Sequence, residues 1–449
     1  MSGPKGWFLG LAALMAALVL ATAPGRAGLF NPEKFTLENG MRVVVIPDHR
    51  APVVTHMVWY MVGAADDPPG KSGIAHFLEH LMFKGTAQVP PGEFSKIVAR
   101  NGGRDNAFTS QDYTGYVQSV AADKLELVMR LEADRAANLV LTEAVVDPER
   151  EVVLEERRSR TDNEPSAILS EQLAAAQFLA HPYGVPVIGW EHEIRTLTKD
   201  DALDFYRTYY VPNNAILVVA GDVTAAQVRP LAEKYYGALA AGQLPPRLRP
   251  QEPPQRAARR LEMRDARVRQ PTWRRSYLAP SRMAGENQHS LPLRALAEIL
   301  GGGPTSRLYR ALVVEQKVAA GASAFYSGRS IDLTRFWVAA TPLPGGDIVA
   351  VEAAAEAVIE RLMAEGVRED ELERSKAGML ASAVYARDSI STAARIFGTA
   401  LAIGLSVEDV ESWPDRVEAL TVEQVNAAAR FVFEVERSVT GVLLPKPAS

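Results

Sequence analysis

The pattern of apolar and polar positions predicts short strands separated irregularly by helices. Runs rich in β-branched residues at 41–46, 53–62, 215–219 and 336–340 are typical of buried strands. Segments that open with Thr and then repeat apolar residues at helical spacing, such as the one from Leu197, are typical of capped helices. Because helices and strands do not alternate regularly, the pattern favours an α+β fold over a regular βαβ fold.

The same helix and strand signals occur twice, about 220 residues apart, which is a domain-scale period. The stretch LTKDDALDFYRTYYVPNNAILVVAGDV from Leu197 resembles LTVEQVNAAARFVFEVERSVTGVLLP from Leu420, and NAFTS from Asn106 resembles SAFYS from Ser323 more weakly. Between the repeats, residues 242–260 are rich in Pro and Arg, and their prolines exclude a continuous helix or central strand. We therefore predict two homologous domains, 30–241 and 261–446, each an antiparallel-rich sheet packed with helices, joined by a linker at 242–260.

The first residues predict export. Lys5 precedes an apolar run from Trp7 to about Ala23 that ends in small residues, which is typical of a secretory signal peptide over residues 1–27. An uncleaved anchor is the alternative, and the run lies at the short end of the membrane-spanning range. Either interpretation places the body of the chain outside the cytoplasm, in the periplasm if the source is bacterial, and the signal-peptide interpretation leaves no stable membrane span in the mature chain.

Composition narrows the possible chemistry. The 449 residues include no cysteine, which excludes disulfides, thiolate catalysis and cysteine-ligated zinc, so any metal must be held by His and carboxylate groups. The net charge of −5 and the absence of a Lys/Arg-rich block argue against nucleic acid as a partner.

One helix carries chemistry on an otherwise apolar segment. The stretch GIAHFLEHLMFKG from Gly73 predicts a helix that is capped by Ser72 and buries Ile74, Phe77, Leu78 and Leu81. His76 and His80 lie four residues apart on an adjacent face, with Glu79 beside them. Two imidazoles at this spacing can share a tetrahedral metal, and the carboxylate can act on a water molecule at that metal. The pattern is HxxEH, the inverted form of the HExxH zinc motif, and a hydrogen-bonded polar helix face is its structural alternative.

A metal site of this kind needs a third ligand, and the stretch DPEREVVLEERRSR from Asp147 offers one. We predict a helix with Asp147 as its cap and Pro148 at its first position. Glu149 and Glu156 lie seven residues apart and share the inward face with two valines, whereas the other two glutamates, Glu151 and Glu155, lean toward an arginine-rich side. Periodicity favours Glu156 or Glu149 as the ligand, and a solvated helix face is the alternative for either.

The sequence resembles the pitrilysin and insulin-degrading enzyme superfamily of inverted zinc peptidases, especially its half-length branch akin to the catalytic subunit of mitochondrial processing peptidase. The resemblance rests on five ordered blocks: WYMVGAADDPPGKSGIAHFLEHLMFKGT, NAFTSQDYTGY, EREVVLEE, HPYGVPVIGWEHEIRTLT and YYVPNNAILVVAGDV. It implies that His76, His80 and Glu156 bind one zinc ion per chain, that Glu79 is the general base, and that Glu149 supports the site without binding metal. It also implies that the two domains form half of a clamshell.

The resemblance further implies how substrate is held. Asn106 and Ala107 would contact the backbone of an extended peptide, and Phe108 would line a side-chain pocket. Strand addition recognises backbone more than sequence, so unfolded peptides or protein segments are the expected substrates. From the residues alone, this stretch is equally well an ordinary sheet strand.

One departure from the family pattern concerns the partner. Active members carry Arg and, seven residues later, Tyr after an SRLY stretch; here Val313 and Ala320 occupy those positions. We therefore predict a heterodimer with a homologous subunit that lacks HxxEH and supplies the Arg and Tyr. The alternatives are a slow homodimer and local replacement by Arg310 or Tyr326. The alternative function is a non-catalytic structural or chaperone-like subunit of the same fold, and the complete HxxEH and Glu156 set argues against it.

Overall fold

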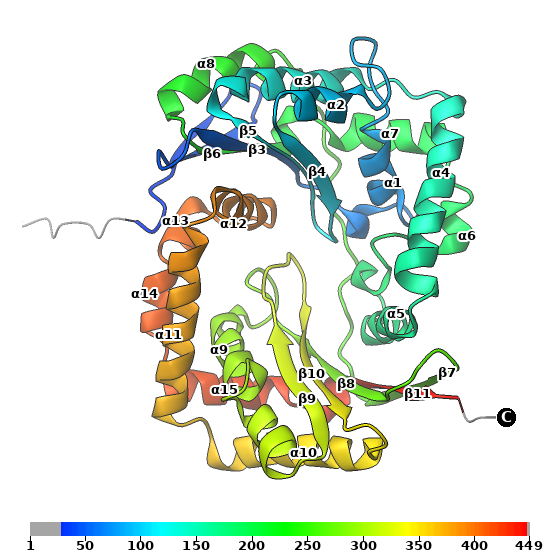
Figure 1. Ribbon diagram of the computed structural model, residues 1–449, viewed down its shortest axis with the longest axis vertical. Helices are drawn as coiled ribbons and strands as arrows, with labels where there is room; N and C mark the ends of the chain where they lie inside the picture. Colours follow the sequence, from blue (N-terminus) through cyan, green and yellow to red (C-terminus); the bar gives the residue numbers. More distant parts are fainter. Residues whose placement is uncertain (1–27, 447–449) are drawn as a thin grey trace, which may run out of the picture.

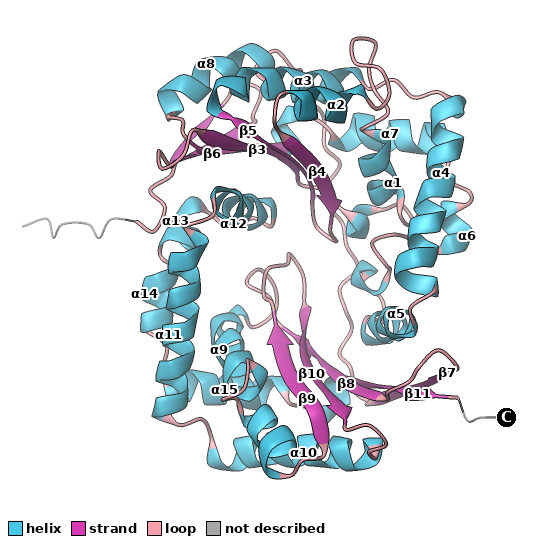
Figure 2. Cartoon of the chain, in the orientation of Figure 1, coloured by secondary structure: helices cyan, strands magenta, loops and turns pink. Residues whose placement is uncertain are grey.

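The structure, a computed structural model, describes residues 28–446, which form two halves that face each other (Figure 1). The predicted signal peptide lies outside the described residues. Each half is built on one β-sheet whose outer face is covered by helices (Figure 2). The predicted α+β class and the pair of sheet-and-helix domains are thereby confirmed.

The two sheets share one topology. The first has the order β1 (Glu33–Thr36), β2 (Arg42–Pro47), β6 (Ala215–Gly221), β3 (Val53–Tyr60), β5 (Thr114–Ala121) and β4 (Arg104–Thr109). The second has the order β7 (Arg259–Asp265), β11 (Ser438–Pro445), β8 (Thr272–Ala279), β10 (Thr334–Pro342) and β9 (Ala319–Tyr326). In both, one pair is parallel, β2 with β6 and β7 with β11, and the next three pairings are antiparallel. The first sheet has one further strand, β1, which pairs antiparallel with the outer side of β2. This shared order explains why sequence similarity recurs between the two halves.

Each sheet buries one apolar face against its own helices. In the first half these are α1 (Ile74–Leu81), α2 (Glu93–Arg100), α3 (Leu125–Asn138), α4 (Glu143–Arg157), α7 (Lys199–Tyr209) and α8 (Ala225–Tyr235), and the short α6 (Glu191–Ile194) lies beside α4. In the second they are α9 (Ser290–Gly301), α10 (Ile348–Glu365), α11 (Glu369–Ala386), α14 (Trp413–Glu418) and α15 (Val422–Val432). Burial of these two separate cores is the main force that stabilises each half.

The halves exchange one helix each. Helix α5 (Pro165–Gln177), from the first half, packs Leu169 and Leu173 against the second sheet. Helix α12 (Ile390–Ala402), followed by α13 (Val407–Glu411), packs from the second half against the inner face of the first sheet. Gly398 permits the close approach of α12, since a Cβ atom there would lie 2.0 Å from the Trp59 ring. The predicted domains are thus interlocked rather than simply consecutive.

The predicted linker also joins the halves. Residues 242–258 contain no helix or strand, and β7 begins two residues inside the predicted linker. Arg249, 5% exposed, lies 2.6 Å from Asp112 and 3.0 Å from Asp66 in the first half and 3.0 Å from Asp332 in the second. Among residues 28–446, no helix combines the length and apolar character that crossing a bilayer requires.

Replacing Arg249 with Ala is expected to lower the free energy of unfolding by about 3–5 kcal/mol, because it leaves buried carboxylates without their cation. Arg247→Ala is the matched control: Arg247 also contacts Asp66 but is 32% exposed, so a loss below about 1 kcal/mol is expected. Urea unfolding of both variants measures the difference. Equal losses of unfolding free energy for the two variants would show that burial of Arg249 does not stabilise the contact between the halves.

Candidate metal centre

Helix α1 begins differently from the prediction. Gly73, not Ser72, is the residue at its start, with a φ of 88°. The Ser72 hydroxyl instead accepts a hydrogen bond from the Trp190 amide at 2.9 Å, and the Asp67 carboxylate accepts from the amides of Gly73 and Ala75. A Cβ atom at Gly73 would lie 2.5 Å from the Ile188 carbonyl oxygen, so the packing of the 188–190 loop requires glycine here. The predicted Ser72 cap is therefore wrong.

Helix α4 also begins earlier than predicted, after Thr142, so the predicted Asp147 cap is wrong and Pro148 lies inside the helix. The reason is that Val146 is fully buried in the first core, and this burial stabilises a helical turn before the proline. Asp147 pairs instead with Arg150 at 2.9 Å. Of the two valines expected on the inward face, Val153 is buried and Val152 is 48% exposed.

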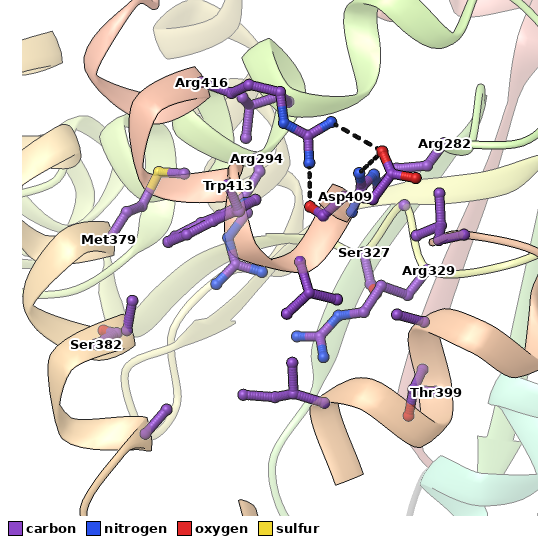
Figure 3. A pocket seen from close by; sticks show the side chains of 18 of the residues that line it. Arg282, Arg294, Ser327, Arg329, Met379, Ser382, Thr399, Asp409, Trp413 and Arg416 are labelled. Carbon is purple, nitrogen blue, oxygen red and sulfur yellow. Dashed lines mark hydrogen bonds and ion pairs between the residues drawn. The ribbon is translucent and has the colours of Figure 1, made fainter. Parts of the chain in front are cut away.

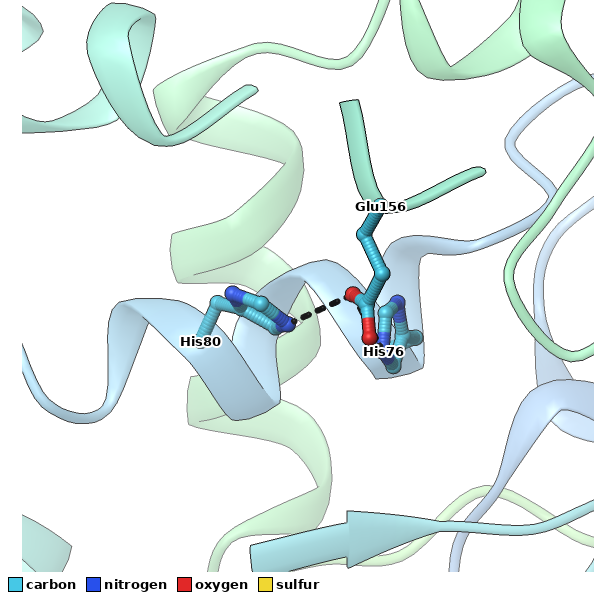
Figure 4. Close-up of side chains that lie close together, drawn as sticks. All are labelled: His76, His80 and Glu156. Atoms are coloured by element: carbon cyan, nitrogen blue, oxygen red, sulfur yellow. Dashed lines mark ion pairs between the residues drawn. The ribbon is translucent and has the colours of Figure 1, made fainter. Parts of the chain in front are cut away.

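Three side chains converge where α4 crosses α1 (Figure 4). The Oε2 atom of Glu156 lies 3.2 Å from His80 Nε2 and 3.5 Å from His76 Nε2. Zinc held tetrahedrally by nitrogen and oxygen ligands at about 2.0–2.1 Å separates those ligands by roughly 3.3–3.4 Å. Glu156 Oε2 is buried and has no hydrogen-bond partner among the described residues. An acceptor left unpaired between two imidazole nitrogens fits a bound cation.

The other side of His80 is held by Glu149. The His80 Nδ1 lies 2.9 Å from Glu149 Oε1, and Lys84 pairs with the second oxygen of that carboxylate. This contact fixes the ring so that Nε2 faces Glu156, an arrangement that orients metal-binding imidazoles in proteins. Burial lowers the pKa of His80, but its interactions with the Glu149 and Glu156 carboxylates outweigh burial and raise the pKa to about 9. Burial, followed by the charge of His80, lowers the pKa of His76 to about 4.

Glu79 points toward the edge strand β4. It is 9% exposed, and its Oε2 accepts a hydrogen bond of 2.6 Å from the Thr109 hydroxyl. Burial raises the pKa of Glu79, although the Thr109 hydrogen bond opposes the shift. Sequence reasoning missed this role of Thr109; the only signal was its place within the NAFTS stretch. The carboxylate is therefore oriented by a residue of the strand expected to hold substrate.

Strand β4 lies at the edge of the first sheet and pairs only with β5 among the described strands. Asn106 is exposed, whereas Ala107 and Phe108 are half-buried. The ring of Phe108 lies on the inner face, 5.0 Å from the Trp59 ring centroid. An edge strand offers unpaired backbone groups, so the position of β4 suits the addition of an extended peptide.

Two residues depart from the family pattern, and both lie near the edge strand of the second sheet: Val313 just before β9 and Ala320 on it. Val313 is half-buried against the second core, and Ala320 is exposed on β9, which corresponds in sheet order to β4. Tyr326 is 3% exposed, and its hydroxyl donates a hydrogen bond to the Pro280 carbonyl oxygen. The Tyr326 side chain is therefore part of the core. Arg310 lies near Glu315 on the exposed surface.

Comparisons with known proteins agree with this geometry. The model of the insulinase family, peptidase family M16, matches residues 42–190, and the model of the M16 inactive domain matches residues 196–379. The zinc protease PqqE of Helicobacter pylori is 32% identical over 97% of this chain and 98% of its own length. An uncharacterized zinc protease of Mycobacterium leprae is 31% identical over 88% of this chain and 87% of its own length.

Solved structures give the same result. A protease from Helicobacter pylori superposes with a TM-score of 0.87 and 32% identity, covering 92% of this chain and 99% of that one. The periplasmic protease PqqL from Escherichia coli, 20% identical, has the same fold with a TM-score of 0.78, and the match covers 92% of this chain but 47% of that chain. The family models, the full-length relatives and the shared two-sheet fold show that this chain belongs to the M16 family, the pitrilysin and insulinase peptidases.

Proposed function

We propose that the chain is a zinc metalloendopeptidase that hydrolyses peptide bonds of unfolded peptides or protein segments. The observation that carries the proposal is the meeting of His76, His80 and Glu156, with Glu79 beside them. Relatives that match almost the whole length of the chain are named zinc proteases, which supports the same activity. Hydrolysis of an internally quenched peptide, followed together with the zinc content of the purified chain, tests the proposal.

In this proposal the protein side chains have separate tasks. His76, His80 and Glu156 would hold one zinc ion, which supplies a Lewis acid and lowers the pKa of a water molecule to about 7. Glu79 Oε1 accepts a proton from the attacking water while Thr109 holds Oε2, and Glu79 then returns that proton to the leaving amine. Glu149 orients His80 from behind. The reaction needs no covalent intermediate with the protein.

Substrate binding is assigned to the edge of the first sheet. Asn106 and Ala107 would contact the backbone of an extended peptide that adds to β4, and Phe108 would line a side-chain pocket. Because Thr109 of the same strand touches Glu79, a peptide in register with β4 passes close to the proposed base. Only an extended segment can add to a strand edge, so folded proteins are poor substrates.

The metal set can be tested without measuring activity. His76→Ala, His80→Ala and Glu156→Gln are each expected to reduce bound zinc from about one per chain to a small fraction, because two protein ligands hold zinc poorly. Glu155→Gln is the matched control, since Glu155 is 68% exposed and pairs with Arg158. Elemental analysis gives the zinc content, and circular dichroism checks the fold. Zinc loss in Glu155→Gln but not in Glu156→Gln would reverse the ligand assignment.

We also propose that the working enzyme is a heterodimer. Neither Val313 nor Ala320 has a side chain that donates a hydrogen bond, so this chain lacks the Arg and Tyr that the family uses against the substrate. The burial of Tyr326 argues against its acting as a local substitute. A homologous subunit that carries Arg and Tyr but lacks HxxEH would complete the site.

Export to the periplasm is part of the proposal and gives a further prediction. The mature chain is expected to begin after Ala23 or Ala27, because small residues at these positions suit signal peptidase cleavage. N-terminal sequencing of protein recovered from the cell envelope measures the start. Recovery of chains that still contain Trp7 would instead support the anchor.

A further inference from the structure

A cavity of about 610 Å³ lies between α9, α11, α12, α13 and α14 and the turn between β9 and β10. Its lining includes five arginines and, within the described part of the chain, one acidic residue: Arg282, Arg294, Arg329, Arg395, Arg416 and Asp409. These residues come from six separate segments of the second half. Figure 3 shows the guanidinium groups of Arg294 and Arg329 pointing into the open space.

The single carboxylate of the cavity is already engaged. Asp409 Oδ1 lies 3.4 Å from Arg282 and 3.6 Å from Arg416 (Figure 3). By contrast, neither Arg294 nor Arg329 forms an ion pair with another residue in the range 28–446, although Glu298 attracts Arg294 at longer range. The Nε of Arg294 is buried without a hydrogen-bond partner in that range. Buried donors are normally satisfied, so this one is available to a ligand.

The arginines also destabilise one another. Burial, followed by the charge of Arg416, lowers the pKa of Arg282 to about 10, and burial, followed by the charge of Arg329, lowers the pKa of Arg294. Like charges in a partly desolvated space repel strongly, and an anion between them would remove that repulsion. The cavity is therefore complementary to a negatively charged group.

The cavity is connected to the proposed peptide-binding strand. Tyr113, at the turn between β4 and β5, lines it and lies 6.3 Å from the Phe108 ring centroid. Arg395 lines the cavity as well, and its guanidinium carbon lies 4.3 Å from the Phe108 centroid. A peptide on the edge of β4 would thus lie near residues that line the cavity. Trp413 and Met379 add apolar lining suited to the methylene stem of a glutamate side chain.

We propose that this cavity binds acidic side chains of peptides held on β4, so that peptides rich in Asp or Glu are the preferred substrates. The proposal rests on the proposed function for the role of β4 as the peptide-binding edge. Arg294 and Arg329 donate charge-assisted hydrogen bonds to the carboxylate, which are stronger than bonds between neutral groups. Basic segments are repelled by the same charges.

The test is peptide binding to the full-length, zinc-loaded Glu79→Gln variant, which separates binding from turnover. Fluorescein-labelled twelve-residue peptides, identical except for one Glu or Gln moved along the sequence, are compared by fluorescence anisotropy. At one or two positions, Glu is expected to bind about tenfold or more tightly than Gln. The double variant Arg294→Gln and Arg329→Gln should lose that preference but keep its affinity for the Gln peptides. Arg361→Gln, an exposed arginine of α10, is the control that should retain it.

Equal affinity for Glu and Gln peptides at every position would overturn the proposal, and so would a preference that survives in the double variant. Binding of inorganic phosphate that depends on Arg294 and Arg329, without any effect of peptide acidity, would make this an inorganic anion site and would also overturn it. Failure of the proposed peptidase activity is recognised separately, as the absence of hydrolysis by the unmutated zinc-loaded chain with its partner.

Discussion

Replacing Glu79 with Gln is expected to reduce peptide hydrolysis by about 10²–10⁴-fold while leaving zinc bound, because the change removes the proton acceptor and spares all three proposed ligands. Gln has nearly the same size and still accepts a hydrogen bond from Thr109 through its amide oxygen. The position of the side chain is thereby kept while its basicity is lost.

The measurement combines zinc content with hydrolysis of a quenched peptide in the presence of the partner subunit. Glu155→Gln, on the exposed side of α4, is the control that should keep both. Hydrolysis at the unmutated rate by Glu79→Gln would refute the assignment of Glu79 as the base. Loss of zinc together with activity would show instead that Glu79 helps to hold the metal.

The parts of the site that depend on local spacing could be predicted from the sequence. His76 and His80 share a helix face because they lie four residues apart, and Glu149 and Glu156 share one because they lie seven apart. These phases do not depend on where each helix begins. The shared faces were therefore predicted correctly although the predicted helix starts, at Ser72 and at Asp147, were wrong.

The caps themselves could not be predicted, because they depend on partners distant in sequence. The Ser72 hydroxyl accepts a hydrogen bond from the Trp190 amide. At the start of α1, the Asp67 carboxylate accepts one from the Gly73 amide. The same limit applies to the exchanged helices α5 and α12, whose apolar faces give no sign of which sheet they cover. Periodicity shows that a helix face is buried but not what buries it.

Two clusters of charged residues also could not be predicted from the sequence. Arg249 belongs to the predicted linker, yet its side chain is 5% exposed among carboxylates from both halves. The arginine cavity draws its side chains from six segments, and none of them forms a motif in the sequence. Charged residues are usually solvated, so only the fold distinguishes these clusters from the surface.

The last prediction concerns the partner. The chain on its own is expected to bind zinc but to cleave peptides slowly, because Val313 and Ala320 occupy the positions proposed to supply the donors that stabilise negative charge on the substrate carbonyl. Val313 packs against the core of the second half and Ala320 is a bare methyl group on β9. Removing one such donor costs about 10²–10³-fold in rate. Supplying both in trans is therefore expected to raise activity by at least that factor.

The experiment adds a homologous chain from the same organism that lacks HxxEH and carries the Arg and Tyr, and measures hydrolysis against its concentration. Saturation near one partner per chain, with zinc content unchanged, is the expected result. A partner whose Arg and Tyr are replaced by Ala and Phe is the control: it should still associate but not activate. If the chain alone hydrolyses peptides at the full rate as a monomer or homodimer, and the partner changes nothing, the site is complete without it and the heterodimer is refuted. Activation by the control partner would instead mean that closing the chamber, rather than the donors, is what the second subunit supplies.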